Sequence, residues 1–240
     1  MKIGILSAFG KESRPLRRRM EEVSRTKVNG QICYTLRYQG QEVVVVQSGM
    51  GKRKAAEGSR LLIDRFSAQV IVNCGVAGAI SPQRHIGDVV ISDQLVEYDA
   101  IPNPSAKMPT YQSHPQLLRT ALQTSPSLPP PETILAGTIL SGNHVVNSEQ
   151  EKRRLWNEFQ GQCVEQEGAG VARVCESFHI PWIVIRGISD LADENALDDF
   201  QKNSQHAIDN MALIVFEFLV TLISSPTMDN LQKSLDGASW

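Results

Sequence analysis

The sequence predicts one α/β domain built on a central β-sheet that is flanked by helices. Apolar, β-branched runs recur along the chain, and helix-like segments lie between many of them. Several of these runs are apolar at successive positions, which is typical of strands that are covered on both faces. The alternation of such strands with helices favours a sheet that is largely parallel.

The expected elements follow from these runs in chain order. Six segments are predicted as strands: KIGILSA from Lys2, EVVVVQS from Glu42, VIVNCG from Val70, DVVIS from Asp88, TILAGTIL from Thr133 and PWIVIRGIS from Pro181. A further strand is expected to end near Val164. Three segments have apolar residues at helical spacing: 52–66, 170–178 and a long segment that starts near His206.

The remaining segments are expected as loops or as a tail. Segments 98–115 and 125–132 are rich in proline and serine, which predicts loops. Residues 1–223 are interpreted as the single domain. Residues 224–240 have weak apolar content and are interpreted as a C-terminal tail, and the sequence leaves open whether that tail is ordered.

Composition limits the class of protein. The chain has 240 residues, a formal net charge of −2, 41% hydrophobic and 21% charged residues. These values are ordinary for a soluble globular protein, and the length can bury a sizeable core. No uninterrupted apolar run predicts a membrane span, and the N-terminus is expected as a first strand rather than a signal peptide. Four scattered cysteines without a C-x-x-C pair favour a reduced, cytoplasmic location.

Near-neutral charge gives no reason to expect a nucleic-acid partner. The basic run at 17–20 is interpreted as a solvated helix face. GMGKRK lacks the third glycine of the dinucleotide fingerprint and the pattern of a P-loop. The five histidines are dispersed without an H-E-x-x-H motif, so no zinc site is predicted. No metal or organic cofactor is expected.

Acids and small residues follow several of the predicted strands. Glu12 follows the first strand, Glu165 and Glu167 follow Val164, and Asp190 follows the last strand. In open α/β sheets, ligands bind beyond the carboxyl ends of the strands. A pocket lined by carboxylates and small residues there would admit a bulky ligand and apply acid–base chemistry to it.

Each acid taken alone also has a purely structural explanation. Glu167 could stabilise a helix dipole, Asp190 could cap the segment that follows it, and Glu12 could be a solvated acid in a first helical turn. The residues alone leave these alternatives open. The order of the surrounding motifs therefore matters more than any single acid.

Taken together, the motifs resemble the 5′-methylthioadenosine/S-adenosylhomocysteine nucleosidases, within the wider purine-nucleoside and uridine phosphorylase superfamily. The resemblance runs from Met1 to about Phe200. Seven motifs carry it in the family's order: MKIGILSAFGKE, VVQSGMGKRKAA, IVNCGVAGAI, IGDVVISD, ILSGNHVVN, VEQEGAGVARVC and PWIVIRGISDLAD. The resemblance implies a phosphorylase/hydrolase-like fold with a mixed sheet, a homodimer and an adenine nucleoside as substrate.

The resemblance also implies roles for individual residues. Glu12 matches the carboxylate that orients the attacking water, and Asp190, preceded by Ser189, matches the acid that faces the purine. Glu167 matches the acid that grips the ribose hydroxyls. Val146 would present backbone groups to the base edge. The further residues expected to contact substrate are Phe9, Met50, Ala77, Gly78, Val145 and Gln166. The role of Glu165 is left open, and its side chain is expected to point away from that of Glu167 in an extended segment.

Two departures from the family pattern bear on the substrate. The family's S-G-D-x-F reads SGNHV here, so that Val145 replaces an aromatic residue that stacks on the base. Its V-E-M-E reads VEQE, so that Gln166 replaces a methionine beneath the ribose. Both changes are compatible with an altered 5′ group. The alternative is therefore an aminodeoxyfutalosine or futalosine hydrolase of menaquinone biosynthesis.

Two further alternatives come from other classes. One is a phosphate-dependent nucleoside phosphorylase, and the other is a non-catalytic nucleoside-binding protein on the same fold. Glu12 would repel phosphate, which favours water as the nucleophile, although Lys11 and Arg14 are close in sequence. The joint presence of Glu12, Glu167 and Asp190 favours an enzyme over a binding protein.

Overall fold

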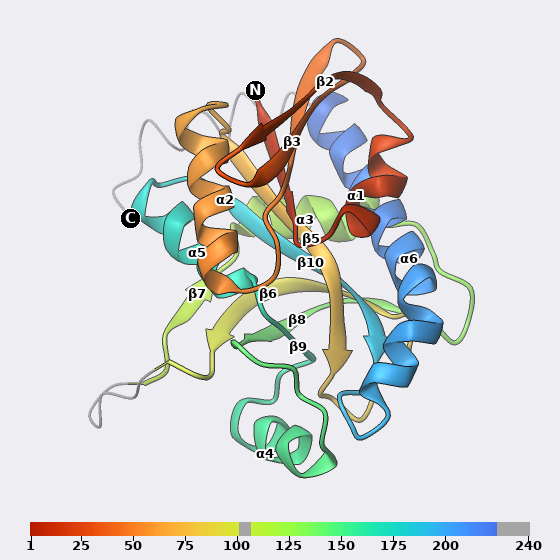
Figure 1. Cartoon of the computed structure of the whole chain (residues 1–240). Coiled ribbons are helices and arrows are strands. Elements are labelled where there is room, and N and C mark those ends of the chain that lie inside the picture. The colour runs from red at the N-terminus through yellow and green to blue at the C-terminus, as the bar shows by residue number, and fades with distance from the viewer. Residues whose placement is uncertain (101–106, 225–240) are drawn as a thin grey trace.

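The computed structural model describes residues 1–100 and 107–224, which form ten strands and six helices (Figure 1). The strands are β1 (Ile3–Ser7), β2 (Glu21–Val28), β3 (Gln31–Tyr38), β4 (Gln41–Gln47), β5 (Val70–Ala79), β6 (Val89–Glu97), β7 (Thr110–Gln112), β8 (Ile134–Ser141), β9 (Cys163–Glu165) and β10 (Trp182–Asp190). The helices are α1 (Gly10–Arg17), α2 (Lys52–Asp64), α3 (Pro115–Thr124), α4 (Glu149–Phe159), α5 (Gly168–Ser177) and α6 (Ala196–Ser224).

All ten strands belong to one mixed sheet, which confirms the predicted fold class. The order is β10-β6-β8-β9-β5-β1-β4-β3-β2, with β7 paired to β6. Parallel pairing holds β1 to β4 and β5, and β5 to β10, whereas β10 and β6 are antiparallel. Because β10 pairs with both β5 and β6, and β9 pairs with both β5 and β8, these five strands close into a barrel-like ring.

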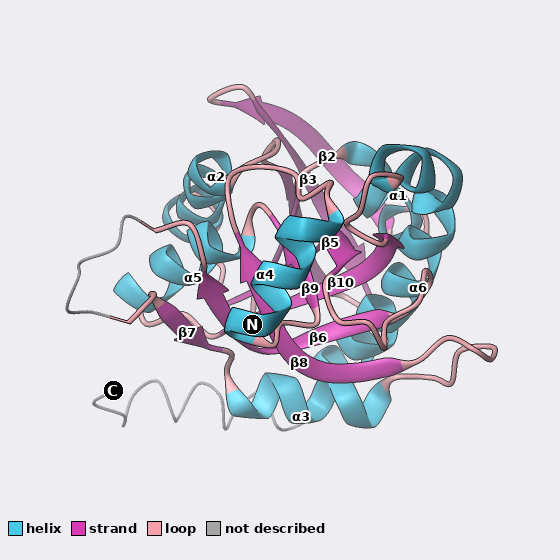
Figure 2. Ribbon diagram, turned by 90° about the horizontal axis from the view of Figure 1, so that it is seen from below, coloured by secondary structure: helices cyan, strands magenta, loops and turns pink. Residues whose placement is uncertain are grey.

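The helices cover the sheet in layers (Figure 2). One core cluster joins the sheet to α1, α3 and α6, and a second joins the opposite face to α2 and α5. A smaller third cluster lies under α4, around Leu155. Central strands such as β5 and β10 are therefore buried on both faces, which explains their nearly continuous apolar sequence.

Helix α6 differs from its prediction. It begins at Ala196, ten residues before the expected start near His206, and runs for 29 residues. The early turns carry the polar sequence DDFQKNSQ, which hid the helical periodicity. The helix is long and apolar enough to qualify as a membrane span by length and composition, although no uninterrupted apolar run in the sequence predicted one. However, the helix packs on β10, β5, α1 and α3, so it serves as the main core helix.

Several elements were not predicted from the sequence. The β2–β3 hairpin turns at Asn29 and Gly30, which both have positive φ, as a two-residue Asn-Gly turn requires. Its outer strand β2 is exposed along nearly its whole length, so it lacks the apolar run used to find strands. Segment 98–115 contains β7 in addition to loop, and its residues 101–106 lie outside the described residues. Residues 225–240 of the predicted tail also lie outside them.

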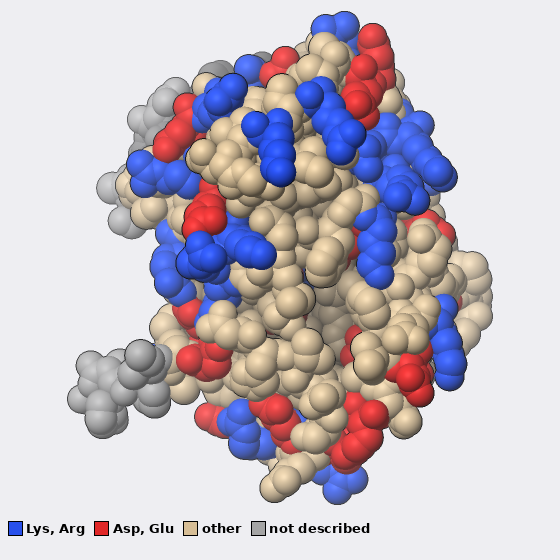
Figure 3. Space-filling model, viewed as in Figure 1, with Lys and Arg blue, Asp and Glu red and all other residues tan. Residues whose placement is uncertain are grey.

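The basic run at 17–20 closes α1 and is mostly solvated, as predicted. Arg18 and Arg19 are exposed, while the guanidinium of Arg17 stacks on the ring of Tyr34 at 4.0 Å. Figure 3 shows Lys and Arg gathered over the upper part of this face, around α1, with uncharged residues near its centre. The arginines of this run thus lie on the periphery of the domain.

The sheet brings distant parts of the chain to one place. Strands β1, β5 and β10 run parallel and end at the same edge. Val164 of β9 pairs with Gly78 near the end of β5, so the residues after β9 reach this edge as well. The acids that follow these strands are therefore neighbours in space, although they are spread over most of the sequence.

Candidate active site

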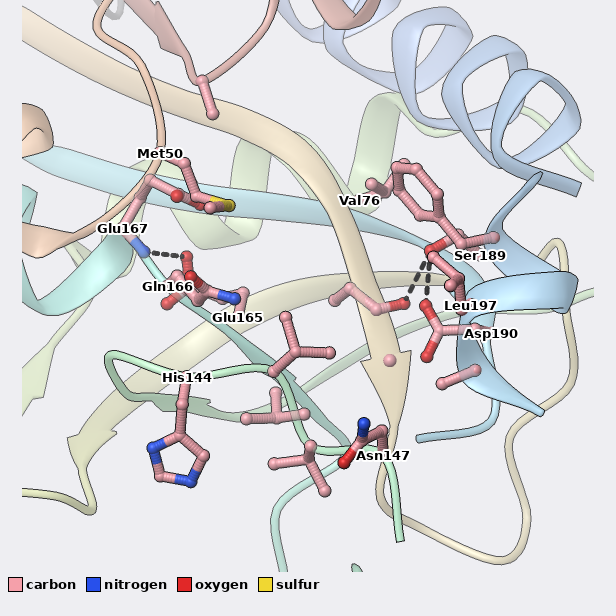
Figure 4. A pocket seen from close by; sticks show the side chains of 18 of the residues that line it. Met50, Val76, His144, Asn147, Glu165, Gln166, Glu167, Ser189, Asp190 and Leu197 are labelled. Atoms are coloured by element: carbon pink, nitrogen blue, oxygen red, sulfur yellow. Dashed lines mark hydrogen bonds between the residues drawn. The ribbon is translucent and has the colours of Figure 1, made fainter. Parts of the chain in front are cut away.

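A cavity of about 470 Å³ lies at this edge of the sheet. Its lining includes all eleven residues that the sequence nominated: Phe9, Glu12, Met50, Ala77, Gly78, Val145, Val146, Gln166, Glu167, Ser189 and Asp190. Figure 4 shows Met50, Gln166 and Glu167 on one side of the cavity and Ser189 and Asp190 on the other. The geometry brings the nominated residues together, and their individual roles stay predictions.

Glu12 is fixed by the start of α1. Its side chain accepts a hydrogen bond from the backbone N–H of Phe9 (2.8 Å), the residue that caps the helix. The other carboxylate oxygen accepts from the backbone N–H of Val76 in β5 (3.3 Å). Burial raises the pKa of Glu12, and these two hydrogen bonds and the charge of Arg186 only partly oppose that rise. A buried acid with a raised pKa is a better proton acceptor than an exposed one.

Glu165 and Glu167, at the start of α5, accept hydrogen bonds from different parts of the backbone. The carboxylate of Glu165 accepts hydrogen bonds from the backbone N–H groups of Glu167 (2.9 Å) and Gly168 (2.8 Å). Glu165 therefore satisfies the first N–H groups of the helix, a role that the sequence offered as an explanation for Glu167. Glu167 instead accepts from the backbone N–H of Gly51 (2.9 Å), the residue that precedes α2.

The expected opposite orientation of Glu165 and Glu167 is wrong. β9 ends at Glu165, and Glu167 has φ −121° and ψ −38°, outside the extended region. Residues two apart in an extended segment share a face, so strand alternation did not support the expectation, and both side chains border the cavity and approach Arg186. Gln166 lies between them, partly buried, with its amide on the cavity side.

Arg186 holds this acidic cluster together from below. It lies in the middle of β10 and is 1% exposed. Its guanidinium forms an ion pair with Glu165, lies 3.5 Å from a carboxylate oxygen of Glu167, and donates to the side chain of Asn73 (2.6 Å). The three nearest acids, Glu12 included, raise the pKa of Arg186 against the opposing effect of burial, so the group stays charged.

The approach of Glu12 to Arg186 requires Gly75. A Cβ atom at this position in β5 would lie 2.4 Å from a guanidinium nitrogen of Arg186 and 2.8 Å from a carboxylate oxygen of Glu12. No residue with a side chain fits there without displacing one of the two charges. The glycine after VIVNC thus serves the packing of the charges rather than a turn.

Asp190 ends β10 on the other side of the cavity. One carboxylate oxygen accepts from the hydroxyl of Ser189 (2.8 Å), and the other accepts from the backbone N–H of Ala192 (3.1 Å). Burial raises the pKa of Asp190 above its ordinary value, while these two hydrogen bonds act in the opposite direction. The raised pKa favours the protonated form, which a proton donor needs.

The mouth of the cavity is apolar. Large hydrophobic side chains are exposed at this rim: Phe9, Met50, Val145 and Leu197. Phe200 lies deeper and is covered by the ammonium group of Lys11, 4.1 Å from the ring centroid. Lys11 also donates to Ser204 of α6, so its ammonium group is held against this helix.

Sequence reasoning missed the roles of several residues here. Arg186 is the clearest, because a charged residue inside the otherwise apolar run WIVIRGIS is itself a signal of a buried ion pair. Leu197 and Phe200 were missed because the helix was expected to start after them. His144 and Asn147 also line the cavity and carry no signal of their own.

The sequence and the fold match those of proteins named as nucleosidases. The family model described as the phosphorylase superfamily matches residues 2–220, so the chain belongs to the phosphorylase superfamily. Within it, the chain is 32% identical over 236 residues to the 5′-methylthioadenosine/S-adenosylhomocysteine nucleosidase of Geobacillus thermodenitrificans, covering 93% of this chain and 98% of that protein. These matches confirm the resemblance drawn from the motifs.

Solved structures give the same picture. The nucleosidase of this type from Neisseria meningitidis, in complex with methylthio-immucillin-A, matches with a TM-score of 0.86 at 27% identity, covering 92% of this chain and 99% of that one. The futalosine hydrolase of Helicobacter pylori matches with a TM-score of 0.85 at 27% identity, covering 92% of this chain and 98% of that one. Both proteins are hydrolases of nucleosides by name.

The first testable consequence concerns Glu167. Burial raises the pKa of Glu167 to about 7, with Glu165 adding to the shift and Arg186 opposing it. As the pH falls through this value, Glu167 takes up a proton and loses the negative charge that it presents to the cavity. We therefore expect kcat/KM to fall below about pH 7 in the wild type.

Glu167→Gln should lower kcat/KM at pH 8 at least roughly tenfold and flatten this acid limb, because the neutral amide cannot stabilise a developing cation. The measurement is kcat/KM from pH 5 to 9, with the exposed Glu158→Gln as the control. A Glu167→Gln enzyme with the wild-type profile would show that this carboxylate plays no part in the reaction.

Proposed function

We propose that this chain hydrolyses the N-ribosidic bond of 5′-modified adenine nucleosides, of the methylthioadenosine and S-adenosylhomocysteine type, and releases adenine. The observation that carries the proposal is the arrangement of Glu12, Glu167 and Asp190 around one cavity, with the two glutamates beside Arg186 and the aspartic acid on the opposite side. This arrangement suits a nucleoside whose base faces Asp190 and whose ribose faces Glu167.

Asp190 would act on the leaving group. Cleavage of the N-ribosidic bond leaves negative charge on the purine, and a proton delivered to its N7 neutralises that charge. Burial raises the pKa of Asp190, which makes its protonated form easier to reach, and the hydroxyl of Ser189 fixes the orientation of its carboxyl group. A general acid of this kind removes much of the barrier to loss of adenine.

Glu12 and Glu167 would act on the sugar. The ribose becomes positively charged as the bond breaks, and nearby carboxylates stabilise this oxocarbenium-like state. Glu12, held between Phe9 and Val76, would align a water molecule and accept its proton as the water attacks the anomeric carbon. Glu167 would bind the ribose hydroxyls, while the backbone N–H of Gly51 donates a hydrogen bond to its carboxylate and fixes its position.

The charges favour water over phosphate as the nucleophile. Four acids line the cavity, and among the described residues no lysine or arginine does so. Lys11 is occupied by Phe200 and Ser204, and Arg14 is exposed on α1. Arg186 is already surrounded by acids and lies below them. A phosphate dianion in the cavity would therefore meet like charges, which supports hydrolysis rather than phosphorolysis.

The experiment is the release of adenine from methylthioadenosine in buffer without phosphate. We expect turnover that added phosphate does not increase.

We also expect Asp190→Asn to lower kcat by roughly 100-fold or more with an unchanged thermal midpoint, because the change is nearly isosteric but removes the acid. The control is Asp193→Asn, three residues further on. Strict dependence on phosphate would replace this proposal by a phosphorylase, and an unchanged kcat in Asp190→Asn would exclude its role as the acid.

A second candidate is a futalosine-type hydrolase, which uses the same chemistry on a larger 5′ group. Val145 leaves an exposed aliphatic face at the cavity mouth where the family stacks an aromatic ring, and Gln166 brings an amide to the sugar side. The similarity to the H. pylori futalosine hydrolase is also compatible with it. These features favour tolerance of a bulky or polar 5′ group rather than a change of reaction.

The substitution Val145→Phe tests this tolerance. A restored aromatic ring should shift relative kcat/KM toward methylthioadenosine by about 1 kcal/mol, roughly fivefold, the size of one aromatic contact. The measurement is kcat/KM for methylthioadenosine and aminodeoxyfutalosine with both enzymes, and Val145→Ile serves as the aliphatic control. Strong selectivity of the wild type for methylthioadenosine would eliminate the second candidate.

Two finer statements belong to the same proposal. We infer a homodimer, because the exposed apolar rim residues Met50 and Val145 flank a cavity that a second subunit could complete. We also infer a cytoplasmic location, which the four buried thiols support. The mass in solution decides between a dimer and a single chain of 26.5 kDa.

A further inference from the structure

A buried ion-pair network lies beside the cavity on residues that the proposed reaction does not use. The ammonium group of Lys52 donates to Glu97 (2.8 Å) and to Asp99. The guanidinium of Arg173 donates to both carboxylate oxygens of Glu97 (2.6 and 2.7 Å). Two cations thus face two anions. Burial alone would raise the pKa of Glu97, but the hydrogen bonds from Lys52 and Arg173 outweigh it and lower that pKa.

The backbone around Lys52 is tied to the ribose side of the cavity. Lys52 is the first residue of α2, and the N–H of the preceding Gly51 donates to Glu167 (2.9 Å). The backbone of Lys52 also packs closely on the first turn of α5, because a Cβ atom on Gly170 would lie 2.1 Å from its carbonyl oxygen. A shift of Lys52 would therefore move the group that holds Glu167.

At the other end of the network, Asp99 contacts a loop that lines a different wall of the cavity from Glu167. Asp99 accepts a hydrogen bond from the backbone N–H of Asn143 (2.8 Å), at the start of loop 143–147. Residues 144–147 of this loop line the cavity. The loop rests closely on Tyr98, since a Cβ atom on Gly142 would lie 2.3 Å from the tyrosine ring. Tyr98 and Asp99 together thus support the loop, the first by packing and the second by a hydrogen bond.

We propose that the Lys52–Asp99 ion pair is a positioning pair that sets the separation between Glu167 and loop 143–147, and so fixes the width of the nucleoside site. This role rests on the proposed function, because it assumes that the ribose and the base contact these two walls. Neither Lys52 nor Asp99 lines the cavity, so the pair acts through Gly51 on one side and Asn143 on the other.

The burial of the pair makes it suited to this task. Lys52 is only 8% exposed, and an ion pair shielded from water is screened far less than a surface pair. Loss of one partner leaves an uncompensated charge inside the protein, and the neighbouring segments must move to let water reach it. Arg173 differs, because its side chain is 58% exposed and contacts Glu97 rather than Asp99. It therefore offers a matched control in the same network.

The test compares Asp99→Ala, Lys52→Met, the double variant and the control Arg173→Met. KM for methylthioadenosine and Kd for adenine by titration calorimetry should rise roughly tenfold in each of the first two, with a smaller change in kcat, because the walls that hold the nucleoside are misplaced while Glu12 and Asp190 stay in place. The double variant should be no worse than the worse single variant, since both changes remove the same Lys52–Asp99 pair. Arg173→Met should stay within about twofold of the wild type.

Thermal midpoints of all variants separate misplacement from unfolding. If Asp99→Ala does not fold, Asp99→Asn replaces it, because the amide keeps an oxygen for Asn143 but loses the charge; its adenine affinity should fall between wild type and Lys52→Met. Unchanged adenine binding in the folded Asp99 variant, additive effects in the double variant, or an equal loss in Arg173→Met would each overturn the positioning role. A wild type that neither cleaves the nucleoside nor binds adenine would overturn the proposed function and this role together.

Discussion

The site depends on one buried cation, Arg186, in the middle of β10. A guanidinium that is 1% exposed must be paired, and Glu165 and Glu167 supply the pairing. Glu165 in turn receives the first N–H groups of α5, which leaves the carboxylate of Glu167 at the surface of the cavity. One positive charge beneath three glutamates does not neutralise them. When all three glutamates are ionised, the cavity carries a negative surplus, which would stabilise a cationic sugar and repel phosphate.

The topology explains how so many segments reach this cation. β5 pairs with β1, β9 and β10, so the ends of these four strands meet around it. Gly75 of β5 provides the space in which Arg186 and Glu12 approach each other. The outer walls of the cavity are positioned by α2 and by loop 143–147, which lie away from Arg186. The acids and the outer walls of the cavity thus depend on different parts of the fold.

Much of this fold could be predicted from the sequence, since the central strands have nearly continuous apolar runs. β2 could not, because an exposed edge strand has no such run. The start of α6 was missed because its first turns carry polar residues between α1 and solvent. The meeting of Glu12, Glu167 and Asp190 at one cavity was predicted from the order of the motifs, and their roles stay predictions. The exchange of roles between Glu165 and Glu167 was not, because it depends on the bend at the end of β9, which spacing alone does not reveal.

The most direct test of whether Arg186 sets the charge of the site is a titration of the glutamate carboxylates. The ¹³C shifts of glutamate-labelled wild type and Arg186→Met would be followed from pH 4 to 9 by NMR, with circular dichroism to verify the fold. Removal of the cation should raise the pKa of the buried glutamates, so that groups ionised in the wild type carry protons at neutral pH in the variant. Identical titration curves in the two folded proteins would contradict the view that this guanidinium sets the charge of the site.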